Sequence, residues 1–204
     1  MRTKKKKPKA YLVILDGRPR KVVDTLAMVN DYISKHPEAT YSEYSSSSEA
    51  RTELYEWIVD NRMEFQFDDG GRSAAGFTGR TGDCAVRSIA IVTGQSYQEV
   101  YDGINVLAER EGPCIRNRPK SNAETGVRPD TMERFLHSAG YWFVPTKRKG
   151  RRCRVHLRNG ELPDGRLAVL VSRHLTAVID GVIHDTRDCG RHAARCVYGY
   201  FIKR

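Results

Sequence analysis

Residues 172–185 read SRHLTAVIDGVIHD, in which the pair Asp180-Gly181 separates two apolar runs. An Asp-Gly pair between two such runs is a strong signal for a β-hairpin with a two-residue turn, and a turn of fixed length also fixes the pairing register. Counted outward from the turn, Ala177 lies opposite His184. The sequence therefore predicts two paired strands whose side chains are already assigned to faces.

The same register places His174 and Asp185 on one face, as diagonal neighbours on adjacent strands, and His184 on the opposite face. A carboxylate at this separation can hold one nitrogen of an imidazole while the other nitrogen meets a nucleophile. That is the role of the third member of a catalytic triad. The hairpin thus predicts a general base, His174, oriented by Asp185.

The candidate nucleophile lies earlier in the chain, in the sequence TGDCAVRSIA at 81–90. Gly82 and Asp83 are typical of loop and helix-cap positions, so the thiol of Cys84 falls in the first turn of a helix. Free backbone N–H groups and the helix dipole lower the pKa of a thiol there. The same N–H groups can receive the oxyanion of an acyl intermediate. We expect Asp83 and Thr81 to act as oxyanion or supporting groups.

A Gly-Asp-Cys sequence at a helix start, followed by a strand histidine and an aspartate on the next strand, resembles the papain-like cysteine peptidase superfamily. The similarity is greatest to its bacteriocin-processing and related small bacterial branches. The segment Cys84-x-x-Arg87-Ser88 also looks like the nucleophile helix of ovarian-tumour-type deubiquitinases. Residues 70–200 look like proteins of actinobacteria and their phages that have no established activity. The glutamine that usually precedes the nucleophile in the superfamily has no counterpart at 76–83.

The resemblance implies a papain-like fold and a cysteine-dependent acyl-transfer hydrolase, a peptidase or isopeptidase acting on a protein or peptide without a cofactor. Cys84 would be the nucleophile, His174 its base and Asp185 the group that orients His174. A degenerate relative that has kept the fold and lost the activity is the alternative reading of the same residues.

Two segments are expected, because charge, glycine and small residues interrupt both apolar periodicities at 68–73 and favour a boundary at about residue 70. Residues 10–69 predict a small ββαβα module, and residues 70–204 predict helices first and an antiparallel sheet afterwards, an α+β order. The expected elements of the two segments are strands at 10–15, 21–23 and 40–44 with helices at 25–35 and 47–61, then helices at 84–92, 97–107 and 129–139 with strands at 141–144, 166–171, 175–179, 182–186 and 196–202.

The N-terminal module resembles the hybrid-binding domain of ribonucleases H and the caulimovirus viroplasmin family. The similarity rests on Tyr-Leu-Val at 11–13, Gly-Arg at 17–18, Pro-Glu-Ala at 37–39, and the aromatic residues Tyr41 and Tyr44. It implies binding to double-stranded RNA or RNA–DNA hybrids. A module for packing or partner docking is the alternative.

The formal net charge of +10 is unevenly distributed: residues 1–9 carry six positive charges, and residues 10–70 carry six Lys or Arg against twelve Asp or Glu. The tail at 1–9 is expected to be disordered, and a second basic run lies further along the chain. Each of these segments is either simply solvated or a contact for nucleic acid or an acidic partner. The second run comprises Lys147, Arg148, Lys149, Arg151 and Arg152. The alternative function is therefore a noncatalytic papain-like protein that contacts nucleic acid or a ribonucleoprotein through the tail and this loop.

Five irregularly spaced cysteines favour reduced thiols over a disulfide framework. Cys189-x-x-His192-x-x-x-Cys196 has ligand types and spacing that zinc accepts. A structural zinc site usually shows two paired knuckles, and Cys114 and Cys153 do not supply a second pair. The prediction is therefore no metal and no cofactor, with Cys114 and Cys153 outside the chemistry.

No stretch of the chain approaches the roughly 20 consecutive apolar residues that a membrane-spanning helix needs. Residues 1–9 have the charge of a signal peptide, but the apolar run at 10–15 is too short for its core. We therefore expect a cytoplasmic protein without membrane contact.

Overall fold

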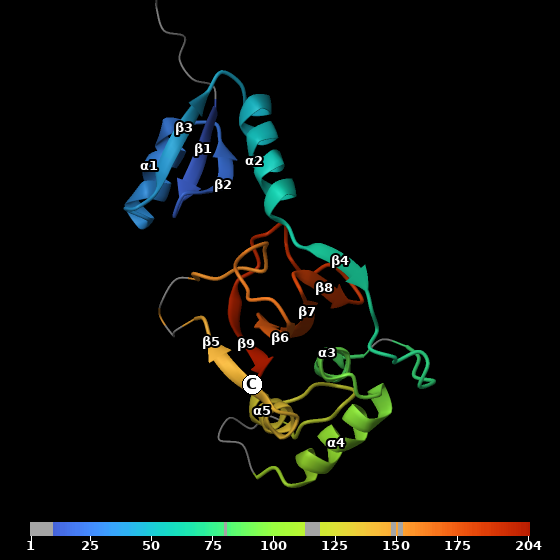
Figure 1. The fold of residues 1–204 in the computed structure, drawn as a ribbon. Helices are drawn as coiled ribbons and strands as arrows, with labels where there is room; N and C mark the ends of the chain where they lie inside the picture. Colours follow the sequence, from blue (N-terminus) through green and yellow to red (C-terminus); the bar gives the residue numbers. More distant parts are fainter. Residues whose placement is uncertain (1–9, 80, 113–118, 148–149, 151–152) are drawn as a thin grey trace, which may run out of the picture. The chain divides into compact units, whose positions relative to one another are not determined.

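The structure is a computed structural model, which describes residues 10–79, 81–112, 119–147, 150 and 153–204 (Figure 1). The chain divides into two compact units, Met1–Asn61 and Arg62–Arg204. Both units mix helices and strands, which confirms the α+β class. None of the helices in the described residues is long and apolar enough to cross a membrane.

The first unit is a three-stranded antiparallel sheet with two helices, in the strand order β2-β1-β3. Asp16 and Gly17, with φ of 55° and 71°, form the tight turn between the first two strands. Thr25 caps the first helix by accepting the N–H of Met28. Its elements are β1 (Ala10–Leu15), β2 (Arg18–Val23), α1 (Leu26–Lys35), β3 (Thr40–Tyr44) and α2 (Ser47–Asn61).

The second unit begins at Arg62, earlier than the boundary expected near residue 70. The reason is a further strand, β4 (Glu64–Phe67), which pairs in parallel with β8 (Val182–Asp185). The N–H of Asp68 continues this contact by donating to the carbonyl of Asp185 at 2.9 Å. A parallel partner this distant in the chain has no connecting turn that local sequence signals can reveal.

Six strands form the sheet of the second unit in the order β4-β8-β7-β6-β9-β5. The pairing of β4 with β8 makes it a mixed sheet rather than the antiparallel one expected. The hairpin between β7 and β8 has the predicted register, with Ala177 opposite His184, and Asp180 and Gly181 turn with φ of 48° and 83°. The remaining strands are β5 (Tyr141–Pro145), β6 (Arg166–Val171), β7 (His174–Ile179) and β9 (Val197–Lys203).

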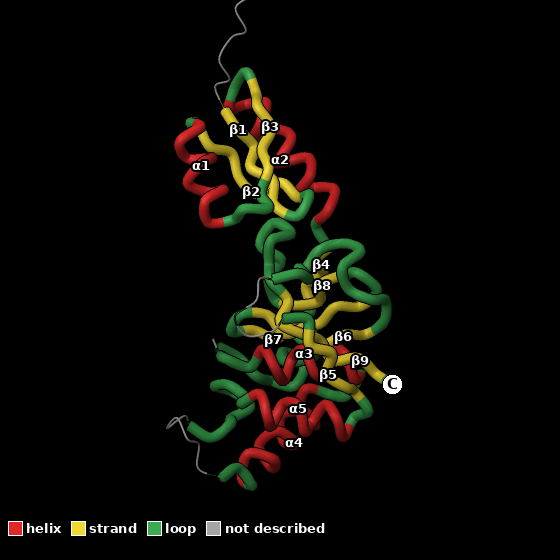
Figure 2. The backbone as a smooth tube through the Cα atoms, turned by 90° about the vertical axis from the view of Figure 1, so that its left-hand side faces the viewer, coloured by secondary structure: helices red, strands yellow, loops and turns green. Residues whose placement is uncertain are grey.

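Three helices lie on one side of this sheet: α3 (Cys84–Thr93), α4 (Tyr97–Glu109) and α5 (Pro129–Ser138) (Figures 1 and 2). Helices α3 and α5 contact its strands, and α4 packs against α3 and α5. Gly94 ends α3 in the left-handed conformation at φ 74°, and Ser96 with Glu99 forms the predicted capping box of α4. Successive residues of β6 alternate between this helical core and a second core on the other face, where Leu157 and Met63 are buried. Strand β7 of the sheet thus packs directly against α3.

Cys153 and Cys196 form a disulfide, contrary to the expectation of reduced thiols. An isolated antiparallel β-bridge between His156 and Cys196 brings the segment after Cys153 beside the segment that carries Cys196. The spacing of cysteines in the sequence does not reveal such a long-range backbone pairing.

Reducing this disulfide, which joins residues separated by 43 positions, is expected to lower the free energy of unfolding by about 4 kcal/mol, because the unfolded chain regains the entropy of the opened loop. Denaturant titrations with and without reductant measure the change. The double variant Cys153→Ser/Cys196→Ser is the control, since its unfolding midpoint should not respond to reductant. An unchanged midpoint for the native chain would contradict the disulfide's stabilising role.

Candidate active site

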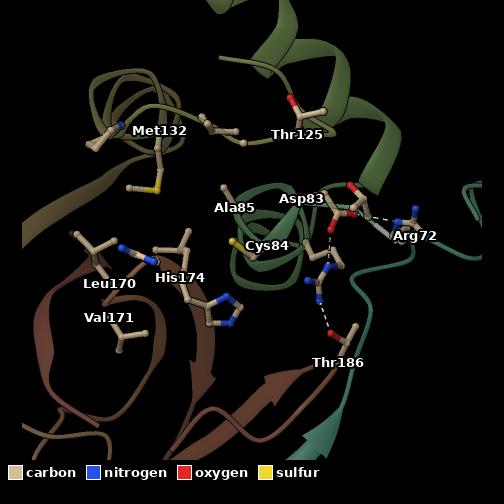
Figure 3. A pocket seen from close by; sticks show the side chains of 18 of the residues that line it. Arg72, Asp83, Cys84, Ala85, Thr125, Met132, Leu170, Val171, His174 and Thr186 are labelled. Atoms are coloured by element: carbon tan, nitrogen blue, oxygen red, sulfur yellow. Dashed lines mark hydrogen bonds and ion pairs between the residues drawn. The ribbon is translucent and has the colours of Figure 1, made fainter. Parts of the chain in front are cut away.

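Cys84 lines a cleft of about 1260 Å³ in the second unit. Its walls come from the first turn of α3, the loop at 125–127, α5, and the β6–β7 turn with the residues that follow β8. Figure 3 shows Cys84 between apolar side chains, Met132 and Leu170, on one side and the polar group of Asp83 and Arg72 on the other. The predicted nucleophile is thus half-buried yet accessible from an open cleft.

The loop before α3 is pinned against the opposite wall of the cleft. Gly82 donates its N–H to the carbonyl of Glu124 at 2.8 Å, and a Cβ at Gly82 would lie only 2.6 Å from the carbonyl oxygen of Thr125. Glycine is therefore required for this close approach. The approach fixes where α3 begins, and with it the position of Cys84.

His174 and Asp185 are in direct contact, with 2.5 Å between His174 Nε2 and Asp185 Oδ2. Since Nε2 is engaged by the carboxylate, Nδ1 is the ring nitrogen left to meet the Cys84 thiol, which lies near enough for the two groups to shift each other's pKa. Ser88 joins helix α3 to strand β7 by donating its buried hydroxyl to the carbonyl of Leu175 at 2.8 Å. The structure therefore brings Cys84, His174 and Asp185 together.

The electrostatics favour a thiolate–imidazolium pair. Burial alone would raise the pKa of Cys84, but the hydrogen bond and charge of His174 outweigh it, so this pKa lies below its ordinary value. Burial alone would lower the pKa of His174, but its hydrogen bonds to Asp185 and to two thiols raise it to about 11. Burial opposes ionisation of Asp185, yet the hydrogen bond and charge of His174 lower its pKa.

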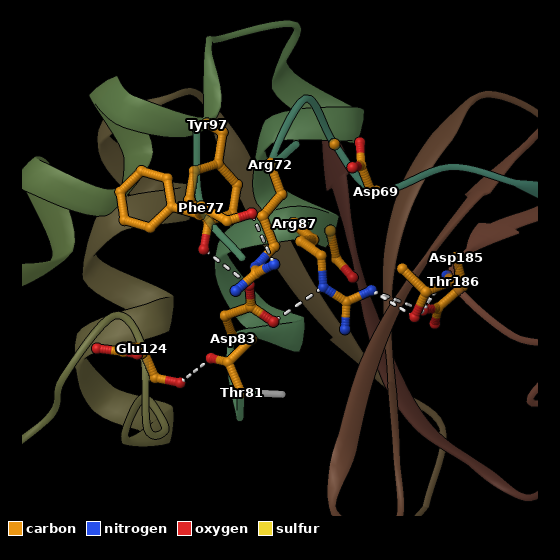
Figure 4. A network of polar contacts seen from close by, with 12 residues as sticks. Asp69, Arg72, Phe77, Thr81, Asp83, Arg87, Tyr97, Glu124, Asp185 and Thr186 are labelled. Atoms are coloured by element: carbon orange, nitrogen blue, oxygen red, sulfur yellow. Dashed lines mark hydrogen bonds and ion pairs between the residues drawn. The ribbon is translucent and has the colours of Figure 1, made fainter. Parts of the chain in front are cut away.

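A buried polar network supports the site behind Cys84 (Figure 4). The carboxylate of Asp83 is fully buried and accepts from Arg72 Nε at 2.8 Å, Arg87 Nε at 2.9 Å and the Tyr97 hydroxyl at 2.7 Å. Arg87 extends the network to Asp185, 3.2 Å from its Nη1. One guanidinium thus links the carboxylate of Asp83 to Asp185, the carboxylate of the candidate triad.

This network assigns Asp83 to support, and not to the oxyanion. Its two carboxylate oxygens already accept hydrogen bonds from Arg72, Arg87 and Tyr97, so this side chain serves as an acceptor and not as a donor to an oxyanion. Thr81 is also committed, because its hydroxyl donates to the carbonyl of Glu124. By helix geometry the N–H groups of the first turn of α3 have no intrahelical acceptor, and Cys84 and Ala85 both line the cleft. Their N–H groups are the oxyanion donors that the geometry offers.

Cys189 lies next to His174, a contact that the sequence did not predict. His174, Asp185 and Cys189 present donor atoms within 4.8 Å of one another, among the described residues the only such group that could hold a metal ion. Two ligands of one tetrahedral zinc ion lie about 3.3 Å apart. The 2.5 Å between His174 and Asp185 is a hydrogen-bond distance instead, which favours a proton-sharing pair over a metal site.

The zinc alternative at Cys189, His192 and Cys196 is wrong, because the disulfide to Cys153 removes the Cys196 thiolate. Of the basic loop, the structure describes Lys147, whose Nζ lies 4.6 Å from the ring centroid of Tyr198. The other predicted contacts of the loop, together with Cys114 and the tail at 1–9, lie outside the described residues.

The chain matches no family model, and no similar protein was found among the curated proteins or the solved structures. A function for this chain has to be argued from the geometry and chemistry of the cleft itself.

Proposed function

We propose that this chain is a cysteine-dependent acyl-transfer hydrolase, a peptidase or isopeptidase, built on a papain-like domain. One observation carries the proposal: His174 contacts Asp185 at 2.5 Å through Nε2, and its ring lies beside the Cys84 thiol in the same cleft. A helix-start cysteine packed on a sheet that supplies histidine and carboxylate on adjacent strands also agrees with the superfamily arrangement.

The reaction proceeds in two steps. The Cys84 thiolate attacks the scissile carbonyl carbon, and the carbonyl electrons move to the oxygen. This oxyanion accepts hydrogen bonds from the N–H groups of the first turn of α3. Imidazolium His174 then gives its proton to the leaving amine, leaving an acyl-enzyme. His174 next takes a proton from water, the resulting hydroxide attacks the acyl carbon, and the Cys84 thiolate departs. Asp185 orients the ring and stabilises its positive form throughout.

For the first unit we propose the hybrid-binding fold, supported by its ββαβα order around one antiparallel sheet. Its residues 10–61 carry nine acidic against five basic groups, which opposes binding to phosphates. We propose a role in packing or partner docking. A gel shift with an RNA–DNA hybrid that persists after removal of residues 1–9 would contradict it.

Alkylation at mildly acidic pH tests the thiolate directly. At about pH 5.5 an ordinary cysteine is almost fully protonated, whereas Cys84 should hold a larger fraction of thiolate because its pKa is lowered. Limiting iodoacetamide should therefore add one alkyl group rapidly, and peptide mapping should find it on Cys84. Because the His174 pKa is raised to about 11, the imidazolium should support this reactivity well into the alkaline range. Intact-mass spectrometry across pH measures the labelling rate.

Two variants serve as controls for the alkylation. Cys84→Ala should lose the rapid phase, and Asp185→Asn should slow it at acidic pH, because the carboxylate that raises the His174 pKa is gone. Slow labelling spread over several cysteines would contradict the ion pair and with it the proposed hydrolase.

A further inference from the structure

The inference drawn here rests on the proposed function and names its substrate class. We propose that the cleft selects peptides that carry acidic side chains next to the bond to be cleaved, through Arg173 and Arg187.

Four arginines line the cleft against a single aspartate. Two of the four are already neutralised: Arg72 bonds Asp83, and Arg87 bonds both Asp83 and Asp185. Arg173 and Arg187 are exposed, and within the described part of the chain neither makes an ion pair. The cleft therefore presents two uncompensated positive charges to whatever enters it.

Arg173 is held beside the candidate base by a tight turn. Val171 pairs with His174 across the hairpin, so Ser172 and Arg173 are its two turn residues. Arg173 has φ of 57°, a left-handed conformation that glycine or asparagine adopts more easily. Arg195 holds the turn by donating from Nη2 to the Ser172 carbonyl at 2.5 Å. An arginine kept in this costly conformation at the cleft is a candidate for function.

Arg187 follows Asp185 at a distance of two residues and lines the same cleft, so the two free arginines flank the His174–Asp185 pair. Positive charge accumulates around this end of the sheet. Burial first, and then the charges of Arg191 and Arg187 among others, lower the pKa of Arg195. Such a field attracts carboxylates and steers acidic ligands toward the cleft.

A peptide fits the rest of the lining better than a fully charged polymer does. Met132, Leu170 and Val171 form an apolar wall opposite the polar group of Asp83 and Arg72 (Figure 3). An apolar side chain against this wall and a carboxylate at Arg173 and Arg187 can belong to one short peptide. We therefore commit to an acidic peptide with an apolar residue near the cleaved bond.

Two experiments use the full chain and matched peptide pairs that differ only by Glu or Gln at the positions flanking a leucine, with both termini blocked. In the first, fluorescence anisotropy measures binding to the Cys84→Ala variant. In the second, hydrolysis by the native chain gives kcat/KM. The Glu peptides should be preferred about tenfold at low salt and less at about 300 mM salt.

The arginines are then varied. Arg173→Gln/Arg187→Gln should reduce the Glu preference to about twofold or less, since bound carboxylates lose their partners, while Arg173→Lys/Arg187→Lys should retain most of it. Arg110→Gln, at an exposed arginine at the end of α4, is the control for removing a positive charge outside the cleft and should leave the preference unchanged.

The outcomes separate this inference from the proposed function. Equal kcat/KM for Glu and Gln peptides would overturn the acidic preference while the hydrolase stands. If no peptide is hydrolysed, Arg173-dependent and Arg187-dependent binding of Glu peptides still supports the inference. If an oligonucleotide displaces the Glu peptides at lower concentration, and through the same two arginines, the cleft is a nucleic-acid site and the inference is wrong.

Discussion

Replacing Cys84 with alanine is expected to lower kcat/KM for peptide hydrolysis by about 10⁴-fold or more, because the Cys84 thiolate is the nucleophile that we propose forms the acyl-enzyme. The loss should appear in kcat and kcat/KM together, since the nucleophile acts in the transition state and contributes little to peptide binding. Fluorogenic peptides containing the Glu–Leu pattern, assayed near neutral pH, give both constants.

The fold should survive the Cys84→Ala replacement, because Cys84 is half-buried at a helix start and alanine keeps the helix. An unchanged melting temperature and retained peptide binding by the variant establish that only chemistry was removed. Hydrolysis that persists in purified Cys84→Ala protein would end the proposal of a cysteine nucleophile.

Replacing Arg87 with methionine is expected to lower the free energy of unfolding by about 3 to 5 kcal/mol. The guanidinium, itself 9% exposed, bridges Asp83 and Asp185, which are 0% and 2% exposed. Methionine fills a similar length but leaves two buried carboxylates short of a partner. Urea titration monitored by circular dichroism measures the difference, with exposed Arg110→Met as the control.

The loss of unfolding free energy in Arg87→Met should depend on pH, because proton binding to the two buried carboxylates is coupled to folding. Without Arg87, the two buried carboxylates lose a positive charge that favours their ionised form, so their folded-state pKa should be higher than in the native chain, and the stability lost at neutral pH should be regained as protons bind. The stability difference between Arg87→Met and the native chain should therefore narrow as the pH falls from about 7 to about 4. A constant or widening difference would show that Arg87 acts through packing instead of charge.

The sequence alone predicted the parts of the site that local rules determine. The Asp180-Gly181 turn allows a single register for its two strands, and that register brought His174 and Asp185 to one face. Gly82 and Asp83 marked the start of α3, which placed Cys84 in the first turn. These predictions depend on residues adjacent in the chain or joined by a two-residue turn, where few conformations are available.

Contacts between distant segments came only from the tertiary structure. The parallel strand β4, the Cys153–Cys196 disulfide and the approach of Cys189 to His174 each join residues with no local signal of their partner. The role of Asp83 changed for the same reason, because Arg72 and Tyr97 reach its carboxylate through the packing of a loop and a second helix.

Local chain geometry thus determined where the candidate nucleophile lies on its helix and how His174 and Asp185 come together. Packing decided their charge states, the support behind them and the two arginines left uncompensated in the cleft. The physical reason is that backbone turns and helix starts are fixed by a few neighbouring dihedral angles. Burial and charge compensation depend instead on which remote side chains fill the same space.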